Sequence, residues 1–148
     1  MPLRRLSTEG RAIVDLSNSI AQEFDLEYVG TEHILLAIVR TPTSVAARAL
    51  ASLGVDEQRA QQTIDDLVQR AKEDTWVFGR LPGTPHYRDV IERAMQIAEQ
   101  LESPTIGSEH LLLALFHHEE STALVALATM GVTRHACREA VLRQLGAR

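Results

Sequence analysis

Residues 30–38, GTEHILLAI, return as residues 107–115, GSEHLLLAL, 77 positions further along the chain of 148 residues. The same shift aligns Arg11 with Arg88 and Gly54 with Gly131 without a gap. Similarity at one fixed spacing is the signature of a repeated structural unit. The sequence therefore indicates a tandem duplication.

Helix-start signals recur at equivalent positions around this stretch. Ser, Thr and Asp are favoured just before a helix because their side-chain oxygen accepts a hydrogen bond from an unpaired amide of the first turn. Four pairs of such residues are separated by the repeat length: Ser7 and Thr84, Thr31 and Ser108, Ser44 and Ser121, and Asp56 and Thr133. Each half is therefore expected to contain four helices.

Apolar spacing supports this interpretation. Ile13, Leu16 and Ile20 follow the three-and-four spacing of a helix with one buried face. Residues 34–39 and 111–116 are apolar on every side, which is typical of a helix buried all round. The third helix of each half is expected to stop at a glycine, Gly54 or Gly131.

These signals divide the chain into repeat one at about residues 6–70, a connector at about 71–83 and repeat two at about 84–148. The connector contains two glycines and a proline, which favour an irregular segment. Trp76 and Phe78 are expected to cover the seam between the repeats rather than to dock a partner.

Composition and charge limit the partners and the cellular setting that are expected for this chain. The net charge is −5 and the basic residues are scattered, so nucleic acid is not an expected partner. Cys137 is the only cysteine, which excludes an internal disulfide and fits a cytoplasmic setting. The longest apolar run, residues 34–39, is too short to cross a bilayer, so no membrane association is expected.

The doubled Gly-Thr/Ser-Glu-His motif, followed by Ala-x-x-Ala-Leu-Ala and Gly-Val in each half, resembles the Clp amino-terminal domain. The likeness is to the ClpC type of Clp/Hsp100 unfoldase and covers nearly the whole chain. It implies an all-α fold in which two tandem four-helix repeats, related by a pseudo-twofold axis, form one compact domain. It also implies a non-catalytic module that binds substrates and adaptor proteins of a Clp protease system, with a Clp unfoldase as a further partner.

The same resemblance implies a phosphoarginine pocket in each repeat. By position, the ligand-binding residues are Glu32 and Glu109, with the hydroxyl groups of Ser7 and Thr84. A carboxylate can pair with a guanidinium, and the amides at a helix start suit a phosphate. A structural alternative is that these residues only stabilise helix starts. A first-turn glutamate gains about 0.3 to 1 kcal/mol from the helix dipole.

No residue pattern supports catalysis or a cofactor. The chain lacks a Gly-x-x-x-x-Gly-Lys-Ser/Thr phosphate loop, a metal-binding histidine spacing and a Gly-x-Ser-x-Gly turn. Two alternatives to the substrate-binding module stay open. One is a free-standing accessory or decoy protein that sequesters ligands or antibiotics aimed at the unfoldase. The other is a small hydrolase that uses His33 and His110.

Overall fold

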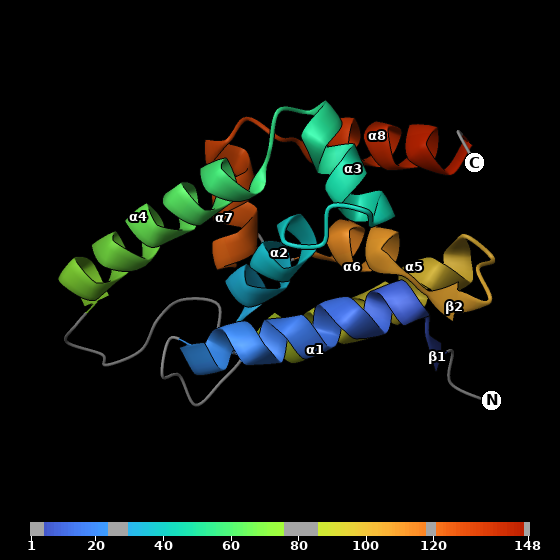
Figure 1. Ribbon diagram of the computed structural model, residues 1–148, viewed down its shortest axis with the longest axis horizontal. Helices are drawn as coiled ribbons and strands as arrows, with labels where there is room; N and C mark the ends of the chain where they lie inside the picture. The colour runs from blue at the N-terminus through green and yellow to red at the C-terminus, as the bar shows by residue number, and fades with distance from the viewer. Residues whose placement is uncertain (1–4, 24–29, 76–85, 118–120, 147–148) are drawn as a thin grey trace.

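The computed structural model describes residues 5–23, 30–75, 86–117 and 121–146, and its main elements are helices (Figure 1). The first repeat contains α1 (Thr8–Glu23), α2 (Thr31–Val39), α3 (Val45–Ser52) and α4 (Glu57–Thr75). The second contains α5 (His86–Gln100), α6 (Ser108–Ala114), α7 (Thr122–Thr129) and α8 (Arg134–Gly146). The predicted all-α fold with two four-helix repeats is confirmed.

The repeats interlock across a pseudo-twofold axis. Within each repeat the first two helices pack together, α1 on α2 and α5 on α6. The last two helices pack across the axis, because α3 lies against α8 and α4 lies against α7 (Figure 1). Exchanging the two repeats turns one of these pairs into the other, as a twofold axis requires. Neither repeat is therefore a free-standing four-helix bundle.

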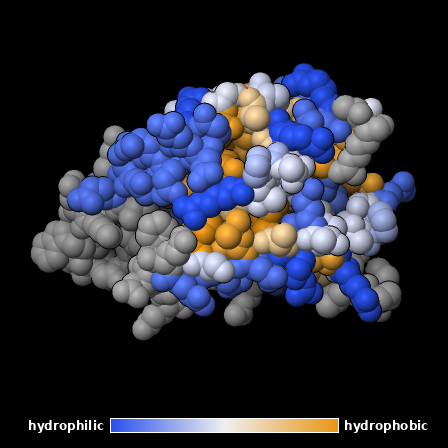
Figure 2. Space-filling model, in the orientation of Figure 1, coloured by the Kyte–Doolittle hydropathy of each residue, from blue (hydrophilic) through white to orange (hydrophobic). Residues whose placement is uncertain are grey.

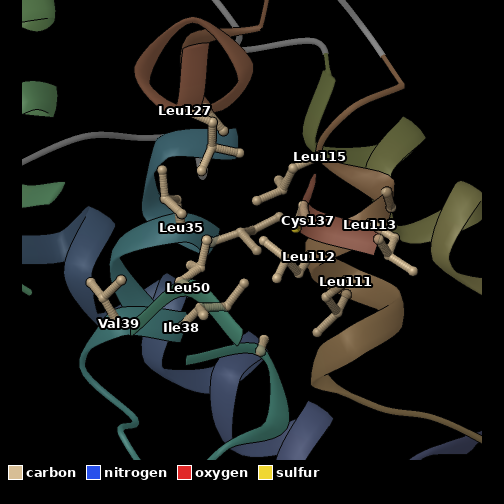
Figure 3. Packing of buried hydrophobic residues seen from close by; sticks show 14 of the residues in the cluster. Leu35, Ile38, Val39, Leu50, Leu111, Leu112, Leu113, Leu115, Leu127 and Cys137 are labelled. Carbon is tan, nitrogen blue, oxygen red and sulfur yellow. The ribbon is translucent and has the colours of Figure 1, made fainter. Parts of the chain in front are cut away.

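The central helices α2 and α6 form the core, as their all-apolar patterns predict. Every residue of α2 is buried, and Leu36 is 0% exposed. Figure 3 shows Leu35 of α2, Leu50 of α3 and Leu112 of α6 pointing toward one another. Outside this core, hydrophilic residues cover α4 on the face shown in Figure 2. The two buried helices position the first-turn residues of the repeated motif in the interior.

Most of the predicted helix caps are confirmed. The side-chain oxygen of Ser44 accepts a hydrogen bond from the amide of Ala47 at 3.1 Å, and that of Ser121 accepts one from Leu124 at 3.2 Å. Asp56 and Thr133 cap the starts of α4 and α8 in the same way. The third helix of each repeat thus begins where the sequence indicates.

Thr31 and Ser108 were predicted as N-caps, and this prediction is wrong. The N-cap residues of α2 and α6 are Gly30 and Gly107, which places both hydroxyl residues one position inside the helix. From there each hydroxyl accepts a hydrogen bond from a backbone amide of the opposite repeat. Thr31 Oγ1 accepts from the amide of Ala123 at 3.1 Å, and Ser108 Oγ accepts from that of Ala46 at 3.1 Å. These hydroxyls therefore cap the third helix of the opposite repeat.

Two features of the structure are not expected from the sequence. One is a short parallel pairing between β1 (Arg5–Leu6) and β2 (Thr105–Ile106). The sequence does not predict it because strands of two residues are too short to show an alternating pattern. Helix α4 continues to Thr75, into the segment expected to be a connector. Trp76, Phe78 and Thr84 lie outside the described residues.

Within the described ranges, three helices end on a residue in the left-handed conformation. Gly54 and Gly131, with φ of 84° and 81°, follow α3 and α7 as predicted. Glu102 takes the same role after α5 with φ of 55°, where the amide of Ser103 bonds to the carbonyl of Ala98 at 2.9 Å. A side chain in this conformation costs about 1 to 2 kcal/mol.

Glu102→Gly is therefore expected to raise the free energy of unfolding by about 1 kcal/mol, because the relief of strain exceeds the entropy that glycine adds to the unfolded chain. Urea denaturation measures the change. Glu99→Gly, inside α5, is the control and is expected to lower stability by about 1 kcal/mol. A loss of stability in both variants would contradict the assignment of strain to Glu102.

Candidate functional site

Glu32 and Glu109 occupy the first turns of α2 and α6, at equivalent places on the two sides of the pseudo-twofold axis. Their exposed fractions are 2% and 7%. Each carboxylate folds back over the glycine before its helix, so that a Cβ atom on Gly30 or Gly107 would collide with the Oε1 atom. The glycine of the repeated motif thus makes room for the carboxylate.

The carboxylate of Glu32 is poorly stabilised. Burial raises its pKa from 4.5 to about 7, and a hydrogen bond from its own backbone amide opposes this rise only in part. Among the described residues its Oε1 atom is buried without a hydrogen-bond partner. An unsatisfied buried acceptor destabilises a fold by about 1 to 3 kcal/mol, so Glu32 is suited to receiving a donor from outside.

His33 and His110 hold the turns that precede these helices. Each Nδ1 atom accepts the amide hydrogen of the N-cap glycine, Gly30 or Gly107, at 2.8 Å. Burial lowers the pKa of His33 to about 4 and also lowers that of His110. The two imidazoles are therefore neutral near pH 7 and fix the helix starts.

The contact between Glu109 and His110 also involves a neutral imidazole. Oε1 of Glu109 lies 3.7 Å from Nδ1 of His110. Because that nitrogen accepts a hydrogen bond from Gly107, it carries no proton to share with the carboxylate. The contact is a close approach rather than an ion pair.

Ser7 lies next to the second repeat. Its amide donates to the carbonyl of Ile106 at 2.9 Å, and Ile106 precedes the motif that carries Glu109. Its Oγ atom accepts from the amide of Gly10 at 2.9 Å, which is the predicted N-cap interaction of α1. The described structure therefore brings Ser7 toward the segment of Glu109, while Thr84 falls outside the described residues.

Glu9 lies beside the candidate site and was not singled out from the sequence. Its Oε1 atom accepts the amide of Val45 at 3.1 Å and also the hydroxyl of Ser108. This carboxylate thereby ties α1 to the starts of α3 and α6. The equivalent position in the second repeat is His86, so the duplication gives no repeated signal at Glu9.

The remaining features that bear on function in the described part of the chain are its thiol, its metal-ligating residue types and the length of its helices. Cys137 is buried, and burial raises the pKa of its thiol to about 12, so it is not a thiolate near pH 7. The described residues contain no group of three or more His, Cys, Asp or Glu side chains placed to hold a metal ion. They also contain no helix with the length and apolarity needed to cross a membrane.

Comparison with known proteins agrees with this architecture. The family model of the Clp repeat (R) N-terminal domain matches residues 5–130 and 82–147. The chain belongs to this family. The chain is 32% identical over 146 residues to the negative regulator of genetic competence ClpC/MecB of Bacillus subtilis and to the chaperone protein ClpB of Oceanobacillus iheyensis. Each alignment covers 99% of this Clp N-terminal domain and 18% of the relative.

Solved structures show the same fold. The N-terminal domain of the chaperone ClpD from Arabidopsis thaliana superposes with a TM-score of 0.75 at 19% identity, covering 99% of this chain and 97% of the other. The Hsp104 N-terminal domain from Candida albicans gives a TM-score of 0.69 at 12% identity, with coverages of 98% and 94%. At these identities the likeness concerns the fold, so the ligand must be argued from the site.

Proposed function

We propose that this Clp N-terminal domain is a non-catalytic module that binds substrate or adaptor proteins for an ATP-dependent Clp unfoldase and protease in the cytoplasm. Its relatives include proteins named ClpC and ClpB, of which it corresponds to 18% of the length. Such a module needs a recognition site rather than reactive groups. The residues that support this role best are Glu32 and Glu109, the two buried glutamates at equivalent positions of the repeats.

We propose that Glu32 and Glu109 each receive the guanidinium of a phosphoarginine side chain. The observation that carries this proposal is the buried Oε1 atom of Glu32, which has no hydrogen-bond partner among the described residues. A guanidinium offers parallel N–H donors that match both oxygens of a carboxylate. Its positive charge would also offset the burial that raises the pKa of Glu32. The phosphate would be attracted to the positive end of the adjacent helix.

Access to the two glutamates is limited. With 2% of Glu32 exposed, a guanidinium can reach this carboxylate only when the groups that cover it move aside. Glu109 is slightly more open at 7%. Ligand binding is therefore expected to include a local rearrangement at the helix starts, with Glu109 the more accessible of the two.

Phosphoarginine is expected to bind with up to two sites per chain, and either Glu32→Gln or Glu109→Gln is expected to weaken its own site by about tenfold or more. Loss of one partner of a charge-assisted hydrogen bond typically removes about 1.5 to 3 kcal/mol. Isothermal titration calorimetry on the wild type, both single variants and the double variant measures these affinities.

Two controls accompany this titration. Glu99→Gln, an exposed change on α5, removes the same charge and should leave binding unchanged. Unphosphorylated arginine should bind more weakly because it lacks the anion that the helix start attracts. Undiminished phosphoarginine binding by the double variant would show that both glutamates serve only the fold.

A further inference from the structure

The second repeat contains a cavity of about 330 Å³ between α5, α6 and α8, separate from the glutamates. It is lined by an apolar wall together with cationic side chains. The apolar lining residues are Ile97, Leu101, Leu113 and Phe116. The polar lining residues are Arg93, Gln100, His117, Arg134 and Arg138. Among the described residues, the lining therefore contains three guanidinium groups and no carboxylate.

Neutral acceptors hold two of these arginines. Arg134 donates to the carbonyl of Phe116, and Arg93 donates to Oε1 of Gln96 at 2.9 Å. Within the described residues, the recorded ion pairs involve none of the three lining arginines. A guanidinium has five N–H donors, so each of these groups retains donors for a ligand.

The first repeat supplies an internal comparison. The positions equivalent to Arg93, Arg134 and Arg138 are Leu16, Glu57 and Gln61.

In that repeat, Arg40 stands where His117 stands in the second. It donates to Gln61 Oε1 at 2.8 Å and lies 3.8 Å from Glu57 Oε2. At this place the first repeat therefore has an arginine beside a glutamate, whereas the second repeat has three arginines. The whole chain has a net charge of −5, so general basicity does not account for this cluster.

From this geometry we propose that the cavity binds the carboxyl-terminal residue of a peptide whose last side chain is apolar. The arginine forks match a terminal carboxylate, and the apolar wall receives the side chain of the same residue. An inorganic anion alone would leave the apolar wall in contact with water. A volume near the lower end of ligand pockets suits a chain end rather than a helix.

Fluorescence anisotropy with a labelled hexapeptide tests this proposal. The peptide ends in leucine with a free carboxylate, and the same peptide with a terminal amide is expected to bind at least about tenfold more weakly. Arg138→Gln should also weaken binding of the free acid by about tenfold. The double variant Arg134→Gln/Arg138→Gln should remove measurable binding. Thermal melts check that each variant is folded.

Arg40→Gln is the matched control, since it removes one positive charge from the equivalent place in the first repeat and should leave peptide binding unchanged. Phosphoarginine binding should be unaffected by Arg138→Gln, which separates this cavity from the glutamate sites. Equal binding of acid and amide peptides would overturn the proposal. Displacement of the peptide by an equal concentration of inorganic phosphate would also overturn it, because the apolar wall would then contribute nothing.

Discussion

Leu36→Ala is expected to lower the free energy of unfolding by about 2 to 5 kcal/mol. Leu36 is 0% exposed and lies on α2, where every residue is buried. Truncation of the side chain would remove apolar contacts and leave a cavity beside α2. Because α2 is buried on every side, its neighbours could close that cavity only in part. Urea denaturation of the wild type and the variant measures the difference.

Leu142→Ala is the matched control for this change, because the same atoms are removed from a side chain that is 41% exposed on α8. Its expected effect is below about 1 kcal/mol, as for most surface substitutions. If both variants lost the same amount of stability, α2 would not be the central support of the fold.

The sequence predicts this buried helix for a clear physical reason. A helix that is apolar on every side can be stable in water only when other elements cover it, so residues 34–39 indicate their own burial. Periodicity does not reveal which element provides the cover. The packing of α3 on α8 and of α4 on α7 across the pseudo-twofold axis therefore came from the structure.

The hydroxyls of Thr31 and Ser108 illustrate the same limit. A Ser or Thr at a helix start indicates that an amide needs an acceptor, and the nearest amide in sequence is the natural choice. Here the capped amides belong to Ala123 and Ala46, in the opposite repeat. A local rule correctly identified the residue type but not a partner that the tertiary structure supplies.

The cationic cavity was missed for the opposite reason. Arg93, Arg134 and Arg138 come from two helices and have no basic counterpart in the first repeat. Residues that occur in only one of the two repeats give no repeated signal in the sequence. Such differences are where two equivalent surfaces can acquire different ligands.

Glu32 shows how burial can outweigh a favourable local term. The helix dipole favours a first-turn glutamate by about 0.3 to 1 kcal/mol, but this figure applies mainly to exposed positions. With a pKa near 7 instead of 4.5, ionised Glu32 destabilises the folded state by about 3 kcal/mol. The penalty is small below pH 4.5, where the carboxyl is protonated in both states, and complete above pH 7.

Glu32→Gln is therefore expected to be more stable than the wild type by about 2 to 3 kcal/mol at pH 8 and by less than about 1 kcal/mol at pH 5. Urea denaturation at the two pH values measures this difference. His33 has the opposite dependence, because a folded pKa of about 4 makes stability rise with pH between 4 and 6.5. His33 is present in both proteins, so its contribution cancels when the variant is compared with the wild type.

Glu99→Gln, on the exposed side of α5, is the control and should change stability little at either pH. An equal effect of Glu32→Gln at pH 5 and pH 8 would mean that the carboxyl is not held near neutrality by burial. A pH-dependent gain would identify a residue that destabilises the folded chain. Because a guanidinium would offset that penalty, the same carboxylate that weakens the free domain would favour a bound arginine side chain.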